Sequence, residues 1–138
     1  MYFKWKDEYA TGIETIDAQH KQLLEIGARI FILAELDDGY DHYDEIMEVL
    51  GELKDYTQYH FGYEEQLMET NGYERYENQK FQHFFVIKKI EKFQSSDIDD
   101  RQKETIIGLA EFISDWIINH ILKEDMQYRE FFISRGIK

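Results

Sequence analysis

The stretch Tyr59-His60-Phe61-Gly62-Tyr63-Glu64-Glu65-Gln66-Leu67-Met68 places a histidine and a carboxylate four residues apart in a segment with helical periodicity. This spacing puts His60 and Glu64 on one face of an α-helix, one turn apart. The same face carries apolar residues at intervals of three and four, namely Ile46, Val49, Leu50, Leu53, Leu67 and Met68. Both polar side chains are therefore predicted to point toward a core.

Two interpretations of this pair are open when it is taken alone. Burying an imidazole and a carboxylate costs several kcal/mol unless each finds a partner. His60 and Glu64 could be a hydrogen-bonded pair in a helical core, or they could bind a metal ion that suits both. Glu65 lies about 100° further around the helix and is predicted to point outward, away from any such site.

Composition favours one all-α domain. The chain has 138 residues, of which 43% are hydrophobic, so it can bury a substantial core. It has no proline and only eight glycines, which lets long helices run without a break. The absence of cysteine excludes disulfides, thiolate catalysis and iron–sulfur clusters. Any metal must therefore be held by histidine and carboxylate.

The net charge of −13 argues against nucleic acid and anionic membranes as partners, because both require clustered Lys and Arg. The N-terminal residues have no apolar segment of the kind found in secretion signals. No run of about eighteen apolar residues is present to span a membrane. A cytoplasmic location is expected.

The hydrophobic pattern predicts an up-down-up-down four-helix bundle. An ordered arm at about residues 1–15, anchored by Trp5 and Tyr9, precedes the first helix, for which Thr15 or Asp17 could be the cap. The second helix is expected to stop at Asn71-Gly72. Short connections favour antiparallel neighbours. The predicted helices are at about 16–36, 41–70, 73–94 and 100–120, with a polar connection at 95–100 and a short C-terminal helix at about 124–134.

This topology brings four histidines to one level of the bundle. One core-facing histidine falls on each predicted helix, and these are His20, His60, His83 and His120. Four imidazoles converging with a carboxylate favour a metal site over an ordinary core pair. His42 lies about 27 Å from His60 along the second helix and is assigned to solvent or to the helix end.

A second histidine-to-carboxylate spacing joins His120 to Asp125, and here it is five residues. Five residues correspond to 140° around a regular α-helix. If both side chains bind one metal site, the backbone between them must widen, break or restart. Alternatively, Asp125 could simply cap the short C-terminal helix.

With these motifs in place, the chain resembles the bacterial-type hemerythrins over nearly its whole length. The resembling stretches are Phe3-Lys4-Trp5, Gly12-Ile13-Glu14-Thr15-Ile16-Asp17-Ala18-Gln19-His20, His60-Phe61, Glu64-Glu65-Gln66-Leu67-Met68, His83, and Trp116 through Asp125. The resemblance implies a helical bundle around two iron ions, bridged by an oxo or hydroxo group and two carboxylates, that binds dioxygen reversibly. By position, His20 and His60 would hold the iron with an open coordination site, His83 and His120 the other, and Glu64 and Asp125 would bridge the pair.

The chain departs from the family at Gln79, where the family pattern has a histidine one turn before His83. Gln79 offers only a neutral amide oxygen, so we expect a weaker ligand or a water molecule in that position. Apolar walls that exclude water from a bound gas are expected from Ile117, Ile121 and Leu24.

Three classes of function follow. The first is a non-haem diiron protein that binds dioxygen for storage, delivery or sensing, without chemical turnover. The second is a diiron oxidase, peroxidase or nitric-oxide-handling enzyme that uses the altered ligand set. The third is a regulatory or structural bundle that has lost its metal. Unpaired buried carboxylates would be a liability without a metal, so the third class is disfavoured.

Overall fold

A computed structural model describes the chain except residues 1–3, 37–38, 96–100 and 138, and the side chains of residues 117–118 and 121–122. The described residues form helices and no strand. A 3-10 turn, Asp7–Tyr9, comes first, and a π-helix, His120–Asp125, joins the last two α-helices. The α-helices are α1 (Glu14–Glu35), α2 (Tyr43–Asn71), α3 (Tyr76–Ser95), α4 (Gln102–Asn119) and α5 (Met126–Ser134).

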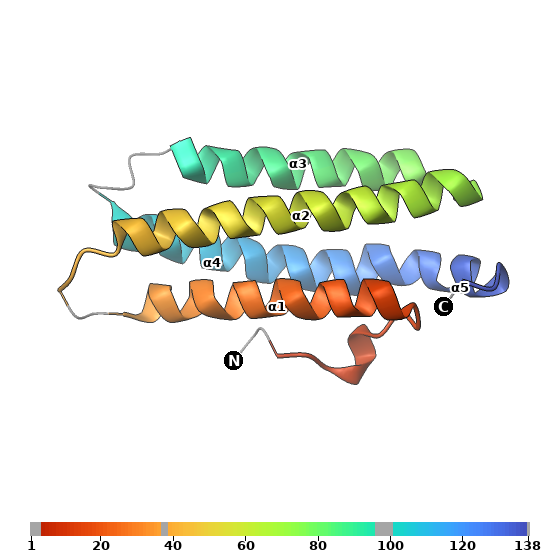
Figure 1. The fold of residues 1–138 in the computed structure, drawn as a ribbon, viewed down its shortest axis with the longest axis horizontal. Coiled ribbons are helices and arrows are strands. Elements are labelled where there is room, and N and C mark those ends of the chain that lie inside the picture. The colour runs from red at the N-terminus through yellow and green to blue at the C-terminus, as the bar shows by residue number, and fades with distance from the viewer. Residues whose placement is uncertain (1–3, 37–38, 96–100, 138) are drawn as a thin grey trace.

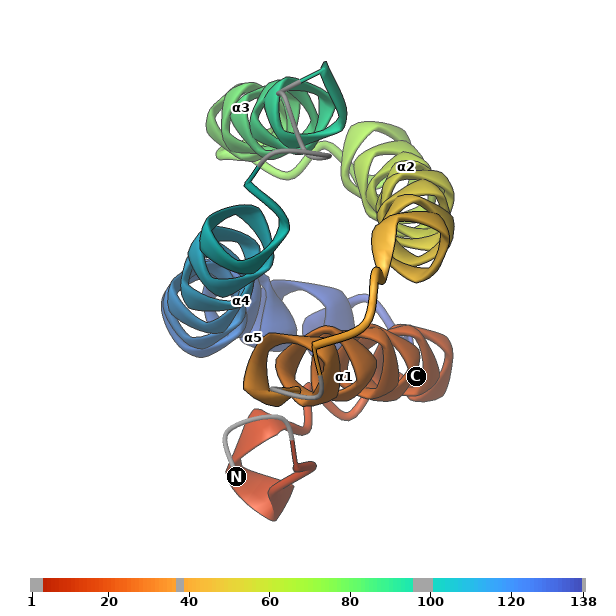
Figure 2. The same ribbon diagram turned by 90° about the vertical axis from the view of Figure 1, so that its left-hand side faces the viewer.

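The four long helices run in alternating directions, as the sequence predicted (Figure 1). Seen from one end, they surround a common core, with α2 between α1 and α3 and with α4 beside α1 (Figure 2). The N-terminal arm lies against the outside of α1 (Figure 1), and α5 follows α4 at the end of the bundle, where it turns toward α1 (Figure 2). The structure is thus the expected antiparallel four-helix bundle.

Two apolar clusters fill the bundle. The larger contains residues of all four long helices and the arm, among them Tyr9, Leu50, Phe61 and Ile113. The smaller joins α5 to the start of α1 and the end of α2 and contains Ile13, Ile16, Met68, Tyr73, Tyr128 and Phe132. Phe61 stacks on His83, and the Tyr128 hydroxyl contacts Glu64. The polar site therefore lies where the two clusters meet.

The start of α1 differs from its prediction. The helix begins at Glu14, and its N-cap is Ile13, which makes no capping bond through its side chain. Asp17 acts on the arm instead, accepting hydrogen bonds from the Thr11 backbone and hydroxyl at 2.8 Å and from the Gly12 amide at 3.3 Å. The arm is ordered around Tyr9, which is buried, and Trp5, which is half-buried.

The turn between α2 and α3 lies where the sequence placed it. α2 ends at Asn71, and Gly72 adopts a left-handed conformation with φ +68°, which glycine reaches without steric cost. α3 begins at Tyr76, three residues later than expected. Residues 96–100 of the polar connection predicted at 95–100 lie outside the described residues. Among the helices that the structure describes, none is long and apolar enough to cross a membrane.

Candidate metal centre

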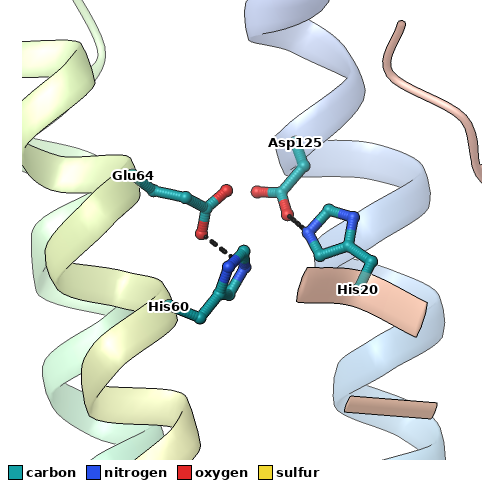
Figure 3. Close-up of side chains that lie close together, drawn as sticks. All are labelled: His20, His60, Glu64 and Asp125. Carbon is teal, nitrogen blue, oxygen red and sulfur yellow. Dashed lines mark ion pairs between the residues drawn. The ribbon is translucent and has the colours of Figure 1, made fainter. Parts of the chain in front are cut away.

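A first group of buried side chains comes from three elements. His20 lies on α1, His60 and Glu64 on α2, and Asp125 at the end of the π-helix, and all four are buried (Figure 3). His20 Nε2 lies 2.9 Å from Asp125 Oδ2, and His60 Nε2 lies 3.0 Å from Glu64 Oε1. One donor atom from each of the four lies within 4.8 Å of the others, an arrangement that could hold a metal ion.

A second group shares Glu64 with the first and adds His83 of α3 and His120 of the π-helix. His83 Nε2 lies 3.5 Å from Glu64 Oε1 and 3.2 Å from His120 Nε2. His120 Nε2 also lies 2.9 Å from Asp125 Oδ1. Asp125 therefore directs one oxygen toward each group, and Glu64 directs Oε1 toward a histidine of each.

The π-helix explains how His120 and Asp125 reach one site. A regular α-helix would separate them by 140°, whereas the i to i+5 hydrogen bonding of a π-helix brings residues five apart onto one face. The sequence predicted a widening or break in this segment, and the π-helix at His120–Asp125 confirms it. The alternative that Asp125 only caps α5 is wrong, since its side chain makes no capping hydrogen bond and is buried between two imidazoles.

The two carboxylates keep their negative charge in spite of burial. Burial alone would raise the pKa of Asp125, but the His120 and His20 imidazoles outweigh it and hold this pKa well below its usual range. Burial and Asp125 also raise the pKa of Glu64, yet His60 and His83 bring it below its usual value. The lowered pKa values favour the ionised form of both carboxylates, and two negative charges so close together favour a cation between them.

The pKa values of the His60 and His120 imidazoles shift in opposite directions. Burial lowers the pKa of His60 more than Glu64 raises it, which favours the neutral ring. Burial would likewise lower the pKa of His120, but Asp125 overcomes this and raises it. His60 donates its Nδ1 proton to Gln19, so its other nitrogen, Nε2, faces Glu64. A neutral ring presents a lone pair there, and a cation between this nitrogen and the carboxylate oxygen would satisfy both.

Several buried donor atoms of the site make no hydrogen bond and are in contact only as ion pairs within the site. They are His20 Nε2, His60 Nε2, Glu64 Oε1 and both oxygens of Asp125, and His20 Nδ1 has no hydrogen bond either. Buried polar atoms are rarely left without a partner in folded proteins. Imidazole nitrogens and carboxylate oxygens together suit zinc, iron and related ions. The residues present therefore fit a metal.

Comparison with known proteins matches this site to a cation-binding family. The family model described as "Hemerythrin HHE cation binding domain" matches residues 11–131. The chain belongs to the hemerythrin family. It is 38% identical to a bacteriohemerythrin of Clostridium acetobutylicum over 91% of this chain and 98% of that protein. It is 36% identical to a bacteriohemerythrin of Pseudomonas aeruginosa over 90% of this chain and 77% of that one. A hemerythrin of Phascolopsis gouldii is 28% identical over 92% and 90% of the two chains.

Gln79, where the chain departs from the hemerythrin pattern, points inward one turn before His83 and is buried. Its amide nitrogen donates to the Glu124 backbone carbonyl at 3.1 Å. Its amide oxygen is buried and has no hydrogen-bond partner. That oxygen is the one atom by which Gln79 could take the place of the imidazole that the resemblance predicts there.

The apolar pocket expected beside the site is described only in part. Leu24 lies one turn after His20 and is buried in the larger apolar cluster. The side chains of Ile117 and Ile121 lie outside the described part of the chain, so their role stays a prediction. His42 precedes α2 and pairs with Glu45 at 3.0 Å, which agrees with its assignment to the helix end.

Sequence reasoning missed three side chains that contact the candidate ligands. Glu65 lies off the inward stripe and is not in either group that could hold a metal, but its long side chain reaches across to α3 and accepts a hydrogen bond from His83 Nδ1 at 2.9 Å, which was not expected. Gln19 accepts a bond from His60 Nδ1 at 2.6 Å, and the Tyr128 hydroxyl donates to Glu64 at 2.5 Å. Gln19 could have been found as a polar residue on the apolar stripe of α1, between Ile16 and Leu23.

Proposed function

We propose that the chain holds two iron ions and binds dioxygen reversibly, for storage, delivery or sensing. His20 and His60 would hold one iron, His83 and His120 the other, and Glu64 and Asp125 would be shared by both. The observation that carries the proposal is the placing of Asp125, which directs one oxygen toward His20 and the other toward His120. When bound, the iron pair supplies the electrons that hold dioxygen reversibly.

The protein's own residues would serve this function by excluding water and orienting the ligands. His20, His60, His83 and His120 are all buried, and Phe61 lies flat against His83 with ring centroids 3.8 Å apart. Gln19 and Glu65 fix which ring nitrogen of their histidine faces the site, because each accepts the proton of the other nitrogen. Leu24 would add an apolar wall beside His20. Gln79 is the candidate seventh ligand through its free amide oxygen.

The relatives' names support this choice over an enzyme, since those matched are called hemerythrin or bacteriohemerythrin. The location in the cytoplasm, and the absence of nucleic-acid partners, stay predictions from composition.

The test is an absorption spectrum of protein loaded anaerobically with ferrous iron. We expect two irons per chain and a visible band that appears with oxygen, disappears under argon and returns over repeated cycles. A one-way conversion to the ferric form, with peroxide or nitric oxide consumed on addition, would overturn carriage in favour of a diiron enzyme. His83→Ala should lower the iron content, and His42→Ala is its matched control, since it removes a histidine far from the site.

A further inference from the structure

The outward face of α3 carries an exposed aromatic cluster that the proposed function does not use. Phe81, Phe84 and Phe85 are 62%, 58% and 59% exposed. They are spaced at i, i+3 and i+4, and the rings of Phe81 and Phe85 lie 5.0 Å apart edge to face. The inward face of the same helix holds Gln79, His83, Val86 and Ile90. No described element covers the outer side of α3 (Figure 2), so the cluster has the character of an interaction surface.

Charges are ordered along this face. Glu77 lies in the first turn of α3 and Lys92 in the last. Positions 77, 81, 84, 88 and 92 follow the helical repeat, so they form one stripe along the outside. The stripe is acidic at its N-terminal end, aromatic in the middle and basic at its C-terminal end. Lys88 already lies over the ring of Phe84, 5.3 Å from its centroid.

We propose that two copies of the chain pair through this face, with their α3 helices antiparallel about a two-fold axis. A two-fold interface must be complementary to itself, and the order of charges on the stripe meets that requirement. With the axis between Phe84 and Phe85, Glu77 of one copy faces Lys92 of the other. The axis also brings Phe84 opposite Phe85.

The same axis places Lys88 of one copy over Phe81 of the other. An ammonium over an aromatic ring is attracted to it, as Lys88 is to Phe84 within one chain. Every position of the stripe then has a matching partner: two ion pairs at the ends, two cation–ring contacts next to them and phenylalanines at the centre.

A second copy fits this face better than a membrane or an acidic protein. Either of those would favour basic residues at both ends of the stripe, and Glu77 would oppose them. The chain carries a net charge of −13, so two copies repel each other over most of their surface. On the stripe, by contrast, the acidic end of one copy meets the basic end of the other, so close approach is favourable there.

The size of the cluster sets the strength of the pairing. At about 150–250 Å² for a buried aromatic side chain, the exposed fractions leave roughly 270–450 Å² of ring surface on each copy. A standard interface buries about 800 Å² on each partner, so charged residues at the margin would make up the rest. The expected dimer is weak, reversible and dependent on concentration.

Analytical ultracentrifugation of the full chain tests the proposal. We expect the sedimentation coefficient to rise from monomer toward dimer as the concentration goes from micromolar toward millimolar. Phe84→Glu should weaken this association at least about tenfold, because it places two carboxylates at the centre of the interface. Ile32→Glu is the matched control, since Ile32 is 55% exposed on α1 and should leave association unchanged. Circular dichroism would show that both variants fold.

Charge exchange at the ends of the stripe gives a sharper test. Glu77→Lys and Lys92→Glu each put like charges opposite each other, so each variant alone should associate more weakly than the parent chain. Mixed in equal amounts, the two variants should form a heterodimer, because each end then meets its opposite charge. The double variant Glu77→Lys/Lys92→Glu should dimerise like the parent chain.

A monomer at every concentration would overturn the proposal, as would single charge variants that associate like the parent chain. Binding of such a monomer to anionic phospholipid vesicles, lost in Phe84→Glu, would assign the face to a membrane instead. Iron content and oxygen binding need not change in any of these variants. Failure of this proposal is thus distinguishable from failure of the proposed function.

Discussion

The candidate site has two halves, the group with His20 and His60 and the group with His83 and His120. They differ in the residue that contacts Nδ1, the nitrogen facing away from the site, of one histidine in each half. His60 donates from Nδ1 to the neutral amide of Gln19, whereas His83 donates from Nδ1 to the carboxylate of Glu65. A carboxylate partner makes an imidazole a stronger metal ligand than a neutral partner does. The stronger donor lies in the half where Gln79 replaces an imidazole. If the proposed ligands are right, Glu65 would offset the weaker donor at position 79 through its contact with His83.

The largest effect should follow removal of Glu64, which both halves share. Glu64→Ala should lower the metal content from two ions per chain to nearly none, because each half loses a donor and Asp125 is left without its opposing carboxylate. Elemental analysis of the loaded protein measures this, with Glu48→Ala, an exposed carboxylate on the same helix, as the control. Retention of one ion would mean that the halves are independent.

Glu65→Gln should weaken metal binding only in the half of the site that contains His83. It keeps the hydrogen bond to His83 but removes the negative charge, so the halves become alike, and we expect a loss of about 10-fold in metal affinity in the His83 half. Competition with a chelator would resolve two dissociation phases, of which one alone accelerates. Gln19→Glu is the matched opposite change and should slow dissociation from the His60 half. Equal acceleration of both phases in Glu65→Gln would remove the basis of the comparison.

Tyr128→Phe should act on both halves equally, since its hydroxyl donates to the shared Glu64. The variant leaves a buried carboxylate oxygen without its donor, which costs about 1.5–3 kcal/mol where the bond is to a charged group. Urea unfolding of the metal-free protein should show this loss of stability. The loss should be smaller in loaded protein, where a cation would offset the negative charge of the same carboxylate; an equal loss in both states would argue against Glu64 as a ligand.

The smallest effect should come from Gln79→His, which strengthens the weaker half. An imidazole is a better donor than a neutral amide, so loss of metal to a chelator should slow severalfold. Unchanged retention would show that the Gln79 oxygen does not bind metal and that Glu65 alone offsets the missing histidine.

The fold and the inward residues could be predicted because helical repeat fixes faces. Residues spaced by three and four must share a side of a helix, so His60 and Glu64 had to be buried together once Leu53 and Met68 were in the core. Antiparallel packing then decided the level of His83 and His120. Asp125 was the exception: its five-residue spacing from His120 predicted that the backbone widens, breaks or restarts, and the structure shows that it widens into a π-helix.

The sequence could not show which side chains are placed to contact a residue on a neighbouring helix. Glu65 lies off the inward stripe, yet its side chain is long enough to contact His83 on the neighbouring helix, and helical angle alone cannot reveal that. The start of α1 was misplaced for a related reason. Asp17 has the chemistry of a helix cap, but it bonds backwards to Thr11 in the arm, a contact that depends on how the arm folds.

The π-helix has a consequence for everything that follows it in the chain. If residues 120–125 were an ordinary α-helix, Asp125 would turn by about a quarter of a circle, and Tyr128 and Phe132 would turn with it. Both are fully buried, so the phase of α5 depends on the same six residues that bring Asp125 to His120. Deletion of the exposed Lys123 would place the aspartate four residues after His120, which is the spacing of His60 and Glu64. An unbroken α-helix would then direct the aspartate, and the buried residues after it, to the same side as the π-helix does now. The π-helix is thus equivalent to one residue inserted into an α-helix. The wider turn accommodates that residue and keeps Tyr128 and Phe132 buried.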